Sequence, residues 1–129
     1  MDNLTTKNAI ITGTRITNSD HDDEFLSIYI ELKADDDVDC TFGGNVLLNR
    51  RKISERGLNY CGIFINKVLE IAGCEDWDKL KGKAVRVKVG HYIANAIGHI
   101  NKNSWFYPEK YFRKLERLSK TTRRSRSEV

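Results

Sequence analysis

The spacing of apolar residues changes along this 129-residue chain, and those changes limit the possible folds more than any other feature. Over residues 25–32, and again over 83–89, apolar residues occupy every second position, as in a strand with one buried face. Over residues 57–73 they recur at intervals of three and four, as in a helix that packs one face against a sheet. These spacings predict an α+β protein.

The expected order of elements is βββ-α-ββ-α. Three β-rich runs in the first 48 residues are separated by short polar turns, which favours antiparallel pairing because parallel neighbours need a long crossover connection. Asn59 suits the N-cap of the helix and Gly73 suits its C-terminal stop. Two strands follow, and Pro108 suits the first turn of a final helix. The predicted fold is an antiparallel β-sheet packed with two helices.

Charge is distributed unevenly along the chain, although the total is only +4. Residues 1–49 carry three bases and ten acids, residues 50–109 eleven bases and six acids, and residues 110–129 eight bases and two acids. We predict a single domain over residues 1–118 and a basic, flexible tail over 119–129. Such polarity favours pairing with a polyanion or with a second copy, so a homo-oligomer is expected. The alternative is a solubilising tail on an ordinary domain.

The three cysteines, Cys40, Cys61 and Cys74, form no C-x-x-C pair, which argues against a zinc knuckle or a dithiol redox motif. Buried structural cysteine is the expected role. The sequence shows neither a signal peptide nor an apolar run long enough to span a membrane. A cytoplasmic protein with reduced thiols and no membrane contact is therefore expected.

Motifs for catalysis are missing from the sequence. Its Ser, Cys and His residues match no nucleophile elbow, and no phosphate loop or dinucleotide fingerprint occurs. Asp-rich turns at 20–24 and 35–39 offer oxygen ligands for Ca²⁺ or Mg²⁺, but they lack the EF-hand glycine and glutamate, and Asp is common in ordinary turns. We expect a non-enzymatic protein without cofactor or metal. A metal-dependent hydrolase that uses these turns is the weakest alternative.

Residues on two segments favour a binding function. Arg86 and Lys88 are predicted to face outward from the strand at 83–89, where they suit phosphate groups. The aromatic run at 105–107 could stack a nucleobase. The alternative role for this run is packing, since aromatic residues that lead into a helix more often belong to a core or an interface.

The pair Gly43 and Gly44 follows Phe42, and no helix opens directly after it. A bulge or a close backbone approach accounts for such a pair; the alternative is that its backbone N–H groups contact a ligand. His99 is expected to be a structural or ligand-contacting residue on a strand. The candidate ligand-binding residues are Arg15, Phe42, Gly43, Gly44, Arg86, Lys88, His99, Trp105 and Phe106.

Four motifs, taken together, resemble a family of small, uncharacterised proteins of tailed phages. They are Thr41-Phe42-Gly43-Gly44, Trp77-x-x-Leu80-x-Gly82-Lys83-x-Val85-Arg86-Val87, Ile97-Gly98-His99-Ile100 and Trp105-Phe106. The resemblance covers about residues 12–108 and implies a phage origin, hence the cytoplasm of an infected bacterial host. In architecture the chain is also similar to phage anti-defence sponges of the Thoeris type, which assemble as oligomers and hold nucleotide signals without cleaving them. No residue role is transferred from those sponges.

The resemblance and the candidate residues together predict a phage-encoded, non-enzymatic binding protein that counters host antiviral defence. Its partner would be a nucleotide-derived small molecule that it sequesters, or a host defence protein that it inhibits. The alternative is a DNA- or RNA-binding accessory protein of phage replication or recombination, with the basic tail contributing to the contact with nucleic acid.

Overall fold

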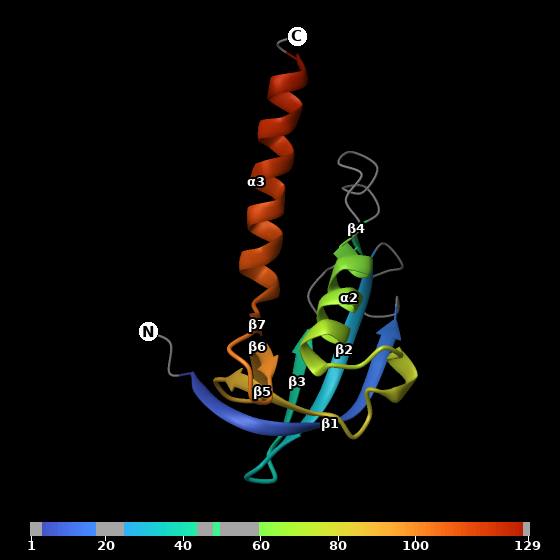
Figure 1. The fold of residues 1–129 in the computed structure, drawn as a ribbon, viewed down its shortest axis with the longest axis vertical. Helices are drawn as coiled ribbons and strands as arrows, with labels where there is room; N and C mark the ends of the chain where they lie inside the picture. The colour runs from blue at the N-terminus through green and yellow to red at the C-terminus, as the bar shows by residue number, and fades with distance from the viewer. Residues whose placement is uncertain (1–3, 18–24, 44–47, 50–59, 128–129) are drawn as a thin grey trace.

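The computed structural model describes residues 4–17, 25–43, 48–49 and 60–127 (Figure 1). It confirms an α+β fold with two α-helices and a mostly antiparallel sheet within that part of the chain. The elements in chain order are β1 (Thr5–Thr17), β2 (Phe25–Ala34), β3 (Asp39–Gly43), β4 (Leu48–Asn49), α2 (Tyr60–Ala72), the 3-10 helix η1 (Trp77–Lys79), β5 (Ala84–Val89), β6 (Ile93–His99), β7 (Trp105–Phe106) and α3 (Pro108–Ser127).

Strands β1, β2, β3, β6 and β5 close into a barrel, a feature that the sequence pattern did not predict. β1 pairs antiparallel with both β2 and β5, and the pairs β2–β3 and β5–β6 are antiparallel as well. A short parallel pairing between β3 and β6 closes the ring, with Thr41 opposite Ile93 and Phe42 opposite Ala94. β4 and β7 extend the sheet from β2 and β6.

The length and curvature of β1 allow this closure. Its first half pairs with β5, and its second half, together with the middle, pairs with β2. The register with β2 shifts between Ile11 and Gly13, which marks a bulge, and bulges bend a strand and increase its twist. Figure 1 shows β1 curving around the base of the barrel.

The core fills the barrel and extends to α2, which packs against β5, β6 and β7. Phe64 and Val68 of α2 are fully buried, as the helical spacing predicted. The ring of Phe64 stacks on that of Phe42 with a centroid distance of 5.4 Å. Gly73 ends the helix in the left-handed conformation, with φ of 65°, so the predicted C-terminal stop is confirmed. Asn59, the predicted N-cap, lies outside the described residues.

Helix α3 begins at Pro108, as predicted, and continues to Ser127. Its first turns pack on the domain through Tyr111 and Phe112, whose rings lie 5.9 and 6.4 Å from Phe106. Beyond them the helix extends away from the barrel (Figure 1). Residues 119–127 are helical in the structure, and a domain boundary after residue 118 stays a prediction. None of the described helices is long and apolar enough to cross a membrane.

Candidate binding surface on strands β5 to β7

Arg86 on β5, Gly98 on β6 and Trp105 on β7 are direct neighbours across the sheet. They lie on its outer face, because the alternate residues Val85 and Val87 are fully buried in the barrel. The indole of Trp105 covers Gly98 so closely that a Cβ atom at this position would lie 2.7 Å from the indole Cδ2. The Arg86 guanidinium carbon lies 4.8 Å from the indole centroid, within the range of a cation–π contact.

Lys88 and Lys110 add two more cations to the same aromatic surface. The Lys88 Nζ atom lies 4.8 Å from the Trp105 ring centroid and 5.3 Å from that of Tyr107, and it donates a 2.6 Å hydrogen bond to the Tyr107 hydroxyl. The Lys110 Nζ atom lies 5.1 Å from the Tyr107 centroid. We call these five residues, Arg86, Lys88, Trp105, Tyr107 and Lys110, the cation–aromatic cluster.

The β6–β7 turn holds Arg86 in place. The Arg86 side chain donates from Nε to the His99 carbonyl at 2.7 Å and from Nη2 to the Lys102 carbonyl at 2.6 Å. The Nδ1 atom of His99 accepts from the backbone N–H groups of Asn101 and Lys102, both at 3.2 Å. The His99 side chain thereby orders the turn whose carbonyl oxygens orient Arg86, which makes it a positioning residue for the cluster.

The cations of the cluster have no carboxylate partner among the residues that the structure describes. Arg86 and Lys88 donate to neutral oxygens, so their positive charges remain uncompensated at the surface. An anion such as a phosphate suits this environment. The ion pairs formed between described residues involve other side chains: Lys7–Asp36, Lys67–Glu70, Lys79–Asp76 and Arg113–Glu109.

A groove of about 300 Å³ adjoins the cluster between α2, β7 and the first turns of α3. Trp105, Tyr107 and Lys110 belong to both the cluster and the groove, so the two form one continuous surface. On the far wall the Lys67 Nζ atom lies 5.0 Å from the ring centroid of Tyr111. The remaining lining residues are Glu70, Ile71, Ser104, Phe106 and Lys114.

Three of the predicted site residues lie in or against the core, and one of them, Phe106, also lines the groove. Phe42 is fully buried and Phe106 is 2% exposed, and each contacts Phe64. Gly43 has φ of 96°, and a Cβ atom there would lie 2.3 Å from the Ile28 carbonyl oxygen. The close backbone approach that the sequence suggested for Gly43 is therefore what the structure contains.

The structure brings together four of the predicted residues: Arg86, Lys88, His99 and Trp105. Arg15 is exposed on the part of β1 that pairs with β2, where it lies opposite Tyr29 and outside the cluster. Gly44 is not among the residues that the structure describes.

Tyr107, Lys110 and the groove residues Lys67 and Tyr111 were missing from the predicted site. Tyr107 belongs to the aromatic run at 105–107, for which the sequence suggested base stacking, although it was not among the candidate ligand-binding residues. Lys67 lies on α2, far from the others along the chain, and only the packing of α2 against β7 places it beside them.

The cysteines and the acidic residues of the described ranges were the other candidates for chemistry. Burial raises the pKa of the Cys40 and Cys61 thiols, so both stay protonated near neutral pH. No three His, Cys, Asp or Glu side chains gather as a metal site within the described ranges. The Asp-rich turn at 20–24 falls outside those ranges.

Comparison with known proteins leaves the chain without a relative from which a function could be inferred. No protein-family model matches the sequence. No curated protein and no solved structure matches it either. The functional proposal consequently depends on the topology of the barrel and on the surface described above.

Proposed function

We propose that this protein binds single-stranded nucleic acid through the cation–aromatic cluster and the adjoining groove, without cleaving it. The topology of the barrel supports this proposal. The ring order β1-β2-β3-β6-β5, with α2 inserted between the third and fourth barrel strands, is the order of the OB-fold. OB-folds are five-stranded Greek-key barrels that commonly bind oligonucleotides.

The observation that carries the proposal is the stacking of uncompensated cations on Trp105 and Tyr107. Cations at a surface neutralise phosphates and release counterions, which drives binding of nucleic acids generally. Half-buried aromatic rings beside them offer faces on which unpaired bases stack, whereas bases in a duplex are already stacked on one another. The combination favours a single strand.

The charge of the barrel surface indicates which face the strand would follow. OB-folds commonly use the face of their second and third strands. In this chain that face exposes the carboxylates of Glu31 and Asp39 and one cation, Lys33, which lies opposite Asp39. Its excess of negative charge repels phosphates. We therefore place the nucleic acid on β5, β6 and β7 and along the start of α3. Such binding fits an accessory role in phage replication or recombination.

Replacement of Lys88 by Ala tests the electrostatic part of the proposal. The measurement is fluorescence anisotropy of a labelled single-stranded oligonucleotide over a range of salt concentrations. We expect weaker binding and a salt slope shallower by about 0.7, since one phosphate contact is lost. Lys79→Ala is the matched control, because Lys79 is 76% exposed and pairs with Asp76 on η1. Equal effects of the two substitutions would contradict the proposed location.

Replacement of Trp105 by Ala tests the stacking part. Loss of one stacked base predicts affinity lower by about 5- to 150-fold. Tyr107→Phe retains the ring and removes only the hydroxyl that Lys88 contacts, so it should retain most of the affinity. A urea unfolding curve for each variant separates loss of binding from loss of fold. Wild-type affinity in folded Trp105→Ala would refute the proposal.

The volume of the groove supports a second candidate function, the binding of a nucleotide-derived immune signal by a phage protein that counters host defence. About 300 Å³ lies at the lower end of the range for small-ligand pockets. Incubation with cyclic mono- and dinucleotides, followed by heat denaturation and chromatography of the supernatant, tests this function. Recovery of intact ligand from the wild type but not from Trp105→Ala would favour it. No retained ligand, together with tight oligonucleotide binding, would exclude it.

A further inference from the structure

A second cleft, of about 500 Å³, lies on the outside of the barrel and borders the cation–aromatic cluster, because its lining residue Asn8 pairs across the sheet with Arg86. Its apolar part is built by the first half of β1 with the neighbouring ends of β2 and β5. Ile10 is 44% exposed there, although it stands at the middle of a strand. The other apolar residues of the cleft are Ala9, Ala34, Ala84 and Ile100.

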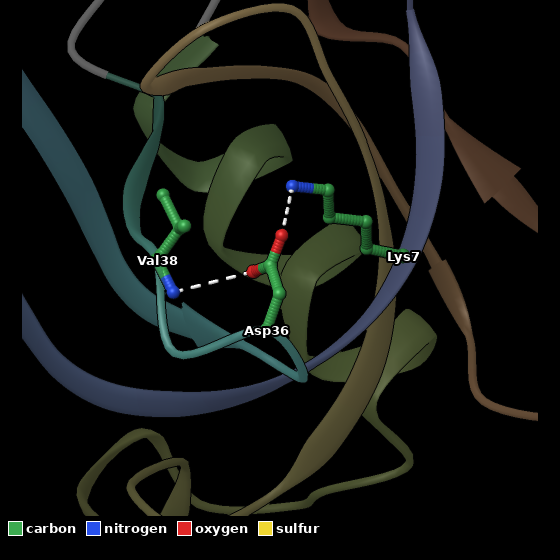
Figure 2. Close-up of polar contacts among 3 residues, drawn as sticks. All are labelled: Lys7, Asp36 and Val38. Atoms are coloured by element: carbon green, nitrogen blue, oxygen red, sulfur yellow. Dashed lines mark hydrogen bonds and ion pairs between the residues drawn. The ribbon is translucent and has the colours of Figure 1, made fainter.

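The turn between β2 and β3 places carboxylates at the edge of this cleft. The Asp36 carboxylate has partners within the same chain (Figure 2). It accepts hydrogen bonds from Lys7 Nζ at 2.6 Å and from the Val38 N–H at 3.2 Å. The hydrogen bond from Lys7 lowers the pKa of Asp36. Asp35 and Asp37 line the cleft and have no ion-pair partner among the described residues. The cleft thus has an apolar floor with acidic groups beside it, and Lys33 is a cation in its lining.

Helix α3 combines basic and apolar residues, and so complements the acidic and apolar residues of this cleft. Its 20 residues contain eight bases and two acids. Tyr111 and Phe112 of its apolar stripe pack on Phe106, but Leu118, two turns further along, is 54% exposed. A basic helix with an exposed leucine matches a cleft that combines apolar and acidic groups.

We propose that copies of this chain associate head to tail, with the region of α3 around Leu118 in the cleft around Ile10 of the next copy. In Figure 1 the C-terminal part of α3 and the β2–β3 turn lie at opposite ends of the long axis of the molecule. One copy cannot bring its own helix end to its own cleft without unfolding, so the occupant is a second copy. The contact joins two different surfaces and therefore leads to an open chain or a ring.

The size of the cleft sets the expected strength of this association. One helical segment in a cleft of about 500 Å³ buries less surface than a stable dimer interface requires. The association should be weak and reversible, with assemblies that grow with protein concentration. It should also weaken with rising salt, because basic and acidic groups face each other across it.

Sedimentation velocity without nucleic acid tests the proposal on the full chain. We expect the wild type to show concentration-dependent growth in mass, and Ile10→Glu and Leu118→Glu each to be monomeric. An equimolar mixture of the two variants should form a dimer and stop there. The intact helix of one variant fits the intact cleft of the other, while both remaining surfaces are blocked.

Ile16→Glu is the matched control, because Ile16 is a 49% exposed isoleucine on the same strand and does not line the cleft. It should assemble like the wild type. A monomeric wild type at all accessible concentrations, or a mixture of the two variants that stays monomeric, would overturn the proposal. Since no nucleic acid is present, these outcomes do not depend on the proposed function.

Discussion

Gly98 has no side chain, and this leaves room on the outer face of β5, β6 and β7 for the side chains of its two neighbours. The indole of Trp105 lies over this glycine, and the Arg86 guanidinium contacts the same ring. An aromatic residue opposite a glycine covers backbone that would otherwise be exposed and stabilises the pair. One small residue therefore creates the space that brings a cation and an aromatic ring together.

Replacement of Gly98 by Ala should destabilise the fold by about 1–3 kcal/mol, because the new methyl group would force the indole of Trp105 to move. Oligonucleotide affinity should fall as well, since the cluster loses its geometry. Urea unfolding and anisotropy measure the two effects. Gly90→Ala is the control, because its Cβ atom would lie 3.6 Å from Leu4 Cδ2, an ordinary contact. Equal stability of the two variants would contradict this account.

Among the elements, α2 connects the closed barrel with the candidate binding surface. Its inner face packs Phe64 between Phe42 and Phe106, and its outer face supplies Lys67 to the groove. The helical spacing of apolar residues predicted the buried face. It carried no information about Lys67, because the role of an exposed residue depends on which element lies beside the helix.

Phe64→Ala should lower the free energy of unfolding by about 3–5 kcal/mol, since it removes a fully buried ring and leaves a cavity between two others. Asn66→Ala, at an exposed position on the same helix, should change it by less than about 0.5 kcal/mol. Thermal or urea unfolding distinguishes the two. Similar losses for both variants would contradict the packing of Phe64 in the core, because alanine has a higher helix propensity than either residue that it replaces.

For the molecule as a whole, separation of charge is the dominant property. Acidic residues collect in the part of the sequence that forms β1 to β3, and basic residues collect on β5, the groove and α3. Under the two proposals above, this distribution would direct an anionic ligand to one side of the molecule and a second copy of the chain to its two ends. The total charge of +4 does not reveal this separation of acidic and basic residues.

Deletion of residues 119–129 removes four bases and one acid and leaves a net charge of +1. We expect the shortened protein to fold, because it keeps the buried core and the α3 residues Tyr111 and Phe112 that pack against it. Its affinity for single-stranded oligonucleotide should fall several-fold at low salt, with a shallower salt slope. Anisotropy against the full chain is the measurement. Unchanged affinity would show that the end of α3 takes no part in binding.

Much of the local structure could be predicted from the sequence. Alternation placed Val85 and Val87 inside and Arg86 and Lys88 outside, and the structure confirms both orientations. The closure of the barrel could not be predicted, because it depends on a parallel pairing between β3 and β6. That pairing uses backbone hydrogen bonds between segments distant in sequence, and such bonds leave no side-chain signature.

The periods of burial and the ends of several elements could be predicted from the amino-acid sequence, since each depends on residues a few positions apart, and the uneven charge is visible in the sequence directly. Tertiary structure alone decided which of these residues became neighbours. It buried Phe42 and Phe106 against Phe64, and it brought the Arg86 guanidinium and the Lys88 Nζ atom each to 4.8 Å from the Trp105 ring centroid. The physical reason is that strand register and barrel closure are set by the packing of the whole core, to which every element contributes at once.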